Sequence, residues 1–147
     1  MATWASFAAE APELAAAVRE RFAVGKHCTM ATLRLDGGPR ISGTEVSFDG
    51  DELVIGSMAG ARKALDLRRD PRLAIHSPSV DPPSPSEWAG EAKLSGVAVE
   101  EPTDDGTHRF VIDVREVVLT RLGGTPPDHL VIESWHIGRG IDRTERR

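Results

Sequence analysis

The amino-acid sequence predicts a mainly β domain with two short helices, built as an antiparallel barrel or sandwich. Six or seven segments have the alternating or β-branched character of strands, and turns rich in Gly and Pro separate them. Most links between these segments are too short for the crossovers that parallel strands require. Closure is favoured for so many antiparallel strands in a small chain, because it removes the unpaired edges through which sheets aggregate.

The composition is that of one globular domain over residues 1–147. The chain is 39% hydrophobic and 28% charged, and its formal net charge is −5. This acidic balance argues against binding to nucleic acid or to an anionic membrane surface. The lone cysteine, Cys28, excludes an internal disulfide and suits a reducing compartment. With no membrane-length apolar run and no signal-peptide pattern at the start of the chain, we expect a cytoplasmic protein.

The first expected element is a helix over about residues 11–25. Pro12 suits the first position of a helix, where its missing N–H is not needed. Leu14, Val18 and Phe22 then fall on one helical face. The helix is therefore amphipathic and is expected to pack on an apolar surface.

Three strands are expected to follow as a meander, over residues 27–35, 40–48 and 52–57. Asp36-Gly37-Gly38 separates the first two and supplies residues that tolerate positive φ. Asp49-Gly50 lies between the second and third, and this dipeptide is typical of a two-residue hairpin loop.

A short helix over residues 60–69 comes next, and it ends before Pro71 because the residue preceding a proline avoids the α region. Residues 72–76 are an expected strand. Residues 77–86 contain four prolines and are expected to be a loop. A loop of this length is often functional, so we hypothesise that it borders the binding cleft and shapes substrate access.

Three more strands are expected over residues 91–99, 109–122 and 130–137, from their alternating apolar residues. The last ten residues, 138–147, are polar and basic, and we expect them to form a tail.

Two stretches of the chain resemble a known family. The segments MATLRLDGGPRIS and GARKALDLRRDPRLAI are similar to the pyridoxamine 5′-phosphate oxidase-like flavin-binding superfamily, and in particular to its short members that use FMN or the deazaflavin F420. The resemblance implies a split antiparallel β-barrel that forms a homodimer. It also implies two coenzymes in clefts at the subunit interface, and redox chemistry that the coenzyme carries out.

The resemblance suggests which residues hold the coenzyme. Arg62 and Lys63 open the short helix, where free backbone N–H groups and the helix dipole favour a phosphate. The matching family position makes Lys63 the phosphate contact. The other implied coenzyme-binding residues come from neighbouring strands and are Arg40, Ile41, Ser42, Gly43, Gly56, Ser57, Met58 and Lys93.

Each of these residues also has a structural interpretation. The basic side chains of residues 60–72 are equally explained as a solvated face paired with Asp66 and Asp70. Asp66 departs from relatives that carry Asn there, and its carboxylate would repel a phosphate unless an arginine intervenes. The five histidines show no metal-ligand spacing, so no metal site is expected.

The sequence therefore predicts an FMN- or F420-dependent oxidoreductase that transfers hydride to or from a small molecule, with no catalytic side chain assigned. Two alternatives are kept. One is a non-enzymatic carrier of a flavin or a tetrapyrrole on the same fold, and the other is a structural dimer that has lost its site.

Overall fold

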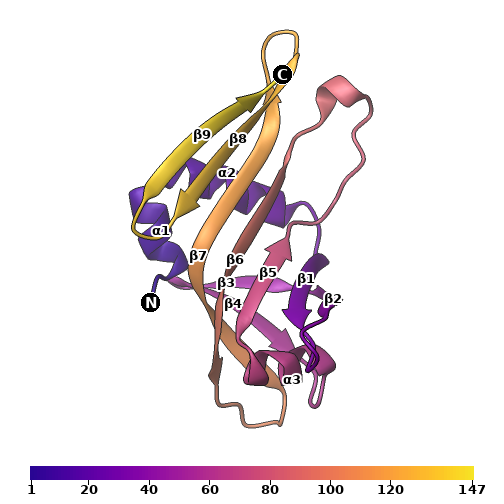
Figure 1. The fold of residues 1–147 in the computed structure, drawn as a ribbon, viewed down its shortest axis with the longest axis vertical. Coiled ribbons are helices and arrows are strands. Elements are labelled where there is room, and N and C mark those ends of the chain that lie inside the picture. Colours follow the sequence, from indigo (N-terminus) through magenta and orange to yellow (C-terminus); the bar gives the residue numbers. More distant parts are fainter.

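A computed structural model describes all of residues 1–147. The helices are α1 (Trp4–Glu10), α2 (Pro12–Ala23) and α3 (Arg62–Arg69), with a 3₁₀ turn, η1, at Pro85–Glu87. The strands are β1 (Cys28–Leu33), β2 (Pro39–Thr44), β3 (Val46–Asp49), β4 (Glu52–Ser57), β5 (Arg72–His76), β6 (Glu91–Glu101), β7 (His108–Gly123), β8 (His129–His136) and β9 (Gly140–Arg146). Figure 1 shows one strongly twisted sheet, with α1 and α2 against one face and α3 at one end.

The strands form an antiparallel barrel, and its two edge strands are joined directly by the chain. Hydrogen bonding connects the strands in the order β2-β1-β5-β6-β7-β4-β3, and the hairpin of β8 and β9 extends from β7. The terminal strands β2 and β3 are separated in sequence by Glu45 alone. The two ends of the path must therefore lie side by side, which curls the sheet into the expected split barrel.

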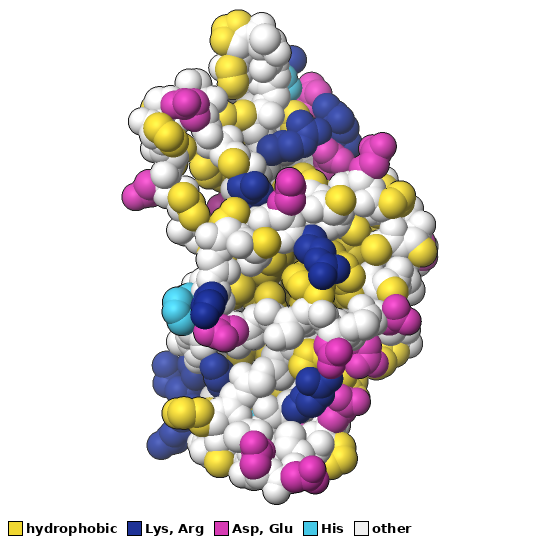
Figure 2. Space-filling model, turned by 180° about the vertical axis from the view of Figure 1, so that it is seen from behind, with side chains coloured by type: hydrophobic (Ala, Val, Ile, Leu, Met, Phe, Trp, Pro, Cys, Tyr) yellow, Lys and Arg dark blue, Asp and Glu magenta, His cyan; other side chains and the backbone are white.

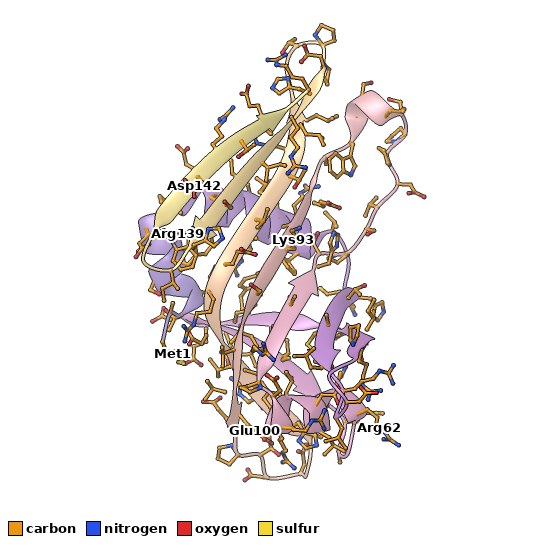
Figure 3. All side chains as sticks on the ribbon, viewed as in Figure 1. Met1, Arg62, Lys93, Glu100, Arg139 and Asp142 are labelled. Atoms are coloured by element: carbon orange, nitrogen blue, oxygen red, sulfur yellow. The ribbon has the colours of Figure 1, made fainter.

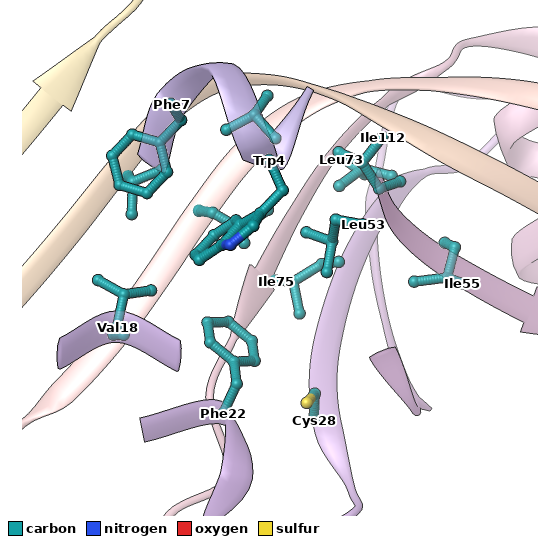
Figure 4. Packing of buried hydrophobic residues seen from close by; sticks show 14 of the residues in the cluster. Trp4, Phe7, Val18, Phe22, Cys28, Leu53, Ile55, Leu73, Ile75 and Ile112 are labelled. Carbon is teal, nitrogen blue, oxygen red and sulfur yellow. The ribbon is translucent and has the colours of Figure 1, made fainter. Parts of the chain in front are cut away.

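The core lies inside this barrel and extends beneath the N-terminal helices. Phe7 and Val18 are fully buried on α1 and α2, and they pack in the same cluster as Leu53 and Ile75 of the sheet. Figure 4 shows the rings of Trp4 and Phe7 over these strands. The Trp4 ring packs edge-on against Phe7 at 5.0 Å and against Phe48 at 4.9 Å between centroids. The helices thus close one mouth of the barrel.

The expected strand over residues 40–48 is in fact two strands. Thr44 ends β2 and Val46 begins β3, because β2 pairs with β1 while β3 pairs with β4 at the other end of the path. The meander survives as two successive hairpins. The second hairpin has Asp49 and Glu52 as its closing pair, so its loop residues are Gly50 and Asp51, one position later than expected.

Three elements were missed. The helix α1 precedes the expected one, with Thr3 as its N-cap accepting from the Ser6 N–H. The 3₁₀ turn η1 lies within the proline-rich loop. The expected tail is instead the strand β9, which pairs with β8 over its whole length. Its charged residues concealed it, because an edge strand exposed on both sides needs no apolar alternation.

No helix is long and apolar enough to cross a membrane.

A β-bulge in the longest strand pair generates a prediction on stability. Pairing of β6 with β7 shifts register between Ser95 and Gly96, and a Cβ at Gly96 would run into the backbone carbonyl of Asp113. We expect Gly96→Ala to lower the free energy of unfolding by about 1–3 kcal/mol, measured by urea denaturation. Gly43→Ala is the control, since a Cβ there meets nothing within 4 Å. Equal stability of the two variants would contradict the close approach.

Candidate functional site

A hollow of about 380 Å³ opens along the line where the sheet closes into a barrel, between β2 and β4. We call it the seam hollow. Five of the residues implied by the family resemblance line it, together with three that sequence reasoning missed: Gly43, Gly56, Ser57, Met58 and Lys63, with His27, Thr44 and Glu45. Gly43 and Gly56 stand on β2 and β4, strands that do not pair with each other. Only barrel closure brings them to one place.

Lys63 supplies the positive charge of the seam hollow. It lies in the first turn of α3, and its Nζ donates to the carbonyl oxygen of Gly43 at 2.7 Å. The ammonium is thereby held across the barrel seam. No side chain caps the N-terminus of α3. The Ala61 and Ala64 N–H groups donate to backbone carbonyls within the turn, which leaves the N–H groups of Arg62 and Lys63 for a ligand.

The donors of the seam hollow fit a phosphate group. The Lys63 ammonium and the Ser57 hydroxyl are both at its wall. Thr44 also lines it and is only 4% exposed, and its Oγ1 has no hydrogen-bond partner. That oxygen is fully covered, so it does not face a ligand in the hollow, and the accessible donors are those of Lys63 and Ser57. Glu45 is the opposing charge, so the hollow suits one anionic group better than several.

Asp66 does not face this hollow. Its carboxylate is 3% exposed and accepts from Thr32 Oγ1 at 2.7 Å, from Arg40 Nε at 2.7 Å and from an Arg69 Nη at 3.0 Å. Burial raises the pKa of Asp66, but these three hydrogen bonds outweigh it, and the pKa lies below its ordinary value. Two guanidinium groups thus neutralise the carboxylate whose repulsion was the objection to a phosphate nearby.

A second hollow, of about 350 Å³, lies on the outer face of the sheet. We call it the sheet-face hollow. Its floor is a row of register partners, Ile41, Ala31, Ala74 and Ser95, on β2, β1, β5 and β6. Directly paired residues share a face, so their side chains form one continuous surface of small and mostly apolar groups. Ile41 is 74% exposed on it.

Polar side chains stand at one side of this floor. Lys93 is exposed on β6, and its register partner on β5 is His76. The ring nitrogens of His76 contact Ser77 O at 2.6 Å and Glu91 Oε2 at 3.0 Å. Glu116, also in the lining, contacts His136 Nε2 at 2.6 Å. Both ring nitrogens of His76 are engaged. His136 is engaged through Nε2 only, and its Nδ1 has no partner but is buried, so neither ring presents an accessible free nitrogen to the hollow.

The two hollows are neighbours. Gly43 lines the seam hollow and Thr29 lines the sheet-face hollow, and these two residues are register partners on adjacent strands. Paired strands lie about 4.8 Å apart. One elongated ligand can therefore place an anionic end beside Lys63 and a flat ring system on the floor of the other hollow.

The remaining predicted residues lie outside the seam hollow. Arg62 is exposed on α3, and Arg40 is turned to Asp66. Ser42 is half-buried beside Gly43, and Lys93 belongs to the sheet-face hollow. Figure 3 shows Arg62 at the α3 end of the molecule and Lys93 further along the sheet. One group of basic side chains lies at that α3 end, and others lie at the middle and toward the opposite end of the molecule (Figure 2). The missed residues carry no sequence signal, because they reach the site through register with other strands.

The proline-rich loop forms a third hollow, of about 300 Å³. Trp88 and Pro78 line it together with Arg21 and Val24 from the end of α2. It shares no lining residue with the other two hollows. The loop base nevertheless meets the sheet-face hollow, through the contact between His76 and Glu91. A role in substrate access stays a prediction.

Comparison with known proteins places this fold and site in a family. The family model described as pyridoxamine 5′-phosphate oxidase matches residues 14–121. This range includes every lining residue of the seam hollow and of the sheet-face hollow. The chain belongs to the pyridoxamine 5′-phosphate oxidase family. Membership fixes neither substrate nor coenzyme for this member. No curated protein sequence matches the chain.

Solved structures of this family's fold resemble the chain closely in shape and weakly in sequence. One is PhzG from Burkholderia lata 383 in complex with tetrahydrophenazine-1-carboxylic acid, with a TM-score of 0.65 at 12% identity, covering 92% of this chain and 89% of that one. Another is an F420 reductase, with a TM-score of 0.50 at 17% identity and coverage of 65% and 91%. A third is HutZ, the haem storage protein of Vibrio cholerae, with a TM-score of 0.54 at 15% identity and coverage of 72% and 90%. Likeness at this identity establishes the fold alone.

The Asp66 network generates a prediction with a pH dependence. We expect Asp66→Asn to lower the free energy of unfolding by about 3 kcal/mol at neutral pH, because two arginines lose a buried anionic partner. The pKa of Asp66 in the folded protein lies below its ordinary value of 3.8. The contribution of Asp66 to folding stability is therefore complete above pH 3.8 and is lost as the pH falls through the folded-state pKa. The gap between wild type and variant therefore narrows in acid, as measured by urea denaturation at several pH values.

The control for this change is Asp104→Asn, which removes the same charge from an exposed turn. A stability gap for Asp66→Asn that is as small as that of Asp104→Asn, or that widens in acid, would contradict the assignment.

Proposed function

We propose that the protein binds FMN or F420 at the interface of a homodimer and works as an oxidoreductase on a small molecule. The observation that carries this proposal is the adjacency of the two hollows. A cationic, donor-rich pocket and an apolar floor meet across one strand spacing, which matches a coenzyme with a phosphate at one end and a planar ring at the other.

This chain's residues have distinct parts in the proposal. Lys63, Ser57 and the free amides of Arg62 and Lys63 hold the phosphate. Ile41, Ala31 and Ala74 support the ring and keep water from one of its faces. A bound flavin or deazaflavin supplies the hydride chemistry, and the protein supplies position, charge and a dry surface.

A second copy of the chain is the proposed cover for the floor. The sheet-face hollow lies open on the outer surface of the sheet. Its Ile41 side chain is 74% exposed, and exposing apolar surface of this kind to water is unfavourable. A homodimer that packs these faces together excludes water from the ring and completes each site with residues of the partner subunit.

A carrier function is the second candidate, and the haem storage protein among the structural neighbours favours it. A tetrapyrrole needs an axial ligand. The exposed His27 lines the seam hollow rather than the apolar floor, and the unpartnered Nδ1 of His136 is buried. His76 would first have to give up its contact with Glu91. A flavin requires no such change. The flavin-type coenzyme is therefore the better fit to this chain.

The deciding experiment is titration of purified protein with oxidised FMN, with oxidised F420 and with haem, followed by absorbance. Saturable binding of FMN or F420 supports the proposal. Oxidation of the bound reduced coenzyme that depends on an added small-molecule acceptor then identifies an enzyme, and tight binding without turnover identifies a carrier. Binding of haem alone, or of none of the three, overturns the proposal.

Removal of the positive charge in the seam hollow is expected to weaken binding. We expect Lys63→Gln to raise the Kd for the bound coenzyme by about ten- to a hundredfold, the usual loss for a hydrogen bond to a charged group. Arg146→Gln on β9 is the matched control, because it makes the same change in net charge at an exposed position outside both hollows. Unchanged affinity of Lys63→Gln would remove Lys63 from the site.

A charge on the apolar floor is expected to prevent dimerisation. We expect Ile41→Glu to sediment as a monomer, because burying an unpaired carboxylate in an apolar interface costs several kcal/mol. Ile141→Glu is the control, since Ile141 is also exposed but lies on β9. A dimeric Ile41→Glu variant, measured by sedimentation velocity, would place the interface elsewhere.

A further inference from the structure

The turn that leads into α3 is tied to the barrel by one buried histidine. The backbone N–H of Gly60 donates to Nε2 of His108, the first residue of β7, at 3.1 Å. Gly60 has a φ of +74°, and the Ala61 N–H closes the turn on the Met58 carbonyl at 3.1 Å. The residues on either side of this turn, Ser57, Met58 and Lys63, are wall residues of the seam hollow. The His108 contact therefore acts on the rim of that hollow.

This contact fixes the protonation state of the imidazole. A backbone N–H only donates, so Nε2 must present its lone pair and the ring proton must lie on Nδ1. Nδ1 is 3.3 Å from Glu100 Oε1, which can accept that proton's hydrogen bond. A protonated ring would instead point an N–H at the N–H of Gly60. Two facing donors repel, so the contact exists only with neutral His108.

The surroundings hold the ring in place. The side chain of His108 is 5% exposed, and its ring stacks near that of Phe110 with 6.3 Å between centroids. Glu100 is itself held by Arg68 of α3, whose Nη2 and Nε donate at 2.7 Å and 2.8 Å. The Arg68 hydrogen bonds lower the pKa of Glu100 to about 2, so the carboxylate stays ionised.

The charged groups that face His108 are therefore Glu100 from β6 and Arg68 from α3. On β4, the register partner of His108 is the neutral Ser57. The next residue, Arg109, is engaged with Glu101 and Asp49 instead. The Glu100 carboxylate is a partner for a charged imidazole, while the contact with the Gly60 N–H requires a neutral one.

We propose that His108 is a positioning residue for the seam hollow, which holds the Gly60 turn while neutral and releases it when protonated. Release frees the segment that carries Ser57, Met58 and Lys63. Its effect on coenzyme affinity rests on the proposed function, whereas its effect on the turn does not.

The first test needs no coenzyme. In ¹⁵N-labelled free protein, the Gly60 amide resonance is followed between about pH 8 and about pH 5, the range in which histidines ordinarily titrate. We expect the Gly60 shift to follow the same titration curve as the His108 ring. In His108→Leu we expect an upfield Gly60 signal that no longer responds to pH. A Gly60 signal that is insensitive to pH, or unaffected by the substitution, overturns the proposal.

The second test uses FMN as the probe. We expect the Kd of wild type for FMN to rise about five- to tenfold from pH 8 to pH 5. We expect the Kd of His108→Leu, at either pH, to exceed the wild-type value at pH 8 by about that factor. His108→Gln offers an uncharged acceptor of similar reach to Nε2. We expect it to restore affinity at pH 8 and to show a smaller rise of Kd toward pH 5 than wild type, the remaining rise coming from protonation of the FMN phosphate. This variant also gives the test if His108→Leu does not fold.

His129→Leu is the matched control, since that side chain is 9% exposed and β8 begins at the end of the sheet opposite α3 (Figure 1). It should leave both readouts unchanged. His108→Gln with the pH profile of wild type overturns the proposal. If wild type binds neither FMN nor F420, the proposed function fails, and the Gly60 resonance still decides this inference.

Discussion

One covalent constraint organises this molecule. The two strands at the ends of the hydrogen-bonded path, β2 and β3, are joined by Glu45 alone. Because a single residue connects the two edge strands, these strands must lie close together. The sheet between them must therefore curl. The same closure sets β2 beside β4 and α3, so that Lys63 reaches the carbonyl of Gly43. The seam hollow is a direct product of the closure that makes the barrel.

The charges of α3 are divided between structure and binding by where they point. Arg69, together with Arg40 of β2, is turned inward and neutralises Asp66, while Arg68 is paired with Glu100. Each of these guanidinium groups has a protein carboxylate as its partner. Lys63 has only a backbone carbonyl, which leaves its full charge available to an anion. Of the four cationic residues of α3, only Lys63 lines the seam hollow.

Proteins of this fold bind chemically different ligands, and the sheet explains how. The floor of the sheet-face hollow is built from small or apolar side chains in register across β2, β1, β5 and β6. A flat apolar surface accepts any planar ring, so the fold by itself selects neither flavin, deazaflavin nor tetrapyrrole. Selection falls to the polar groups around it. In this chain these are the donors of the seam hollow, and beside the floor His76, both of whose ring nitrogens are engaged.

The sequence by itself determined the local structure. Alternation and turn residues predicted most strands, both hairpins and the position of α3, and short motifs predicted the family that the match over residues 14–121 shows. These features depend on neighbouring residues along the chain. The break at Glu45 and the helix α1 were missed, because each depends on contacts with residues distant in sequence. The strand β9 was missed for another reason, since it is exposed and charged and shows no apolar alternation.

Only the tertiary structure decided which residues share a site. It placed Gly43, Ser57 and Lys63 around one hollow, turned Arg40 away to Asp66, and added Thr44 and Glu45, which no motif marked. It also set the buried His108 against Gly60, 48 residues apart. The sequence determines the chemistry of each side chain. Strand register and barrel closure determine which side chains become neighbours, and both are collective properties of the fold.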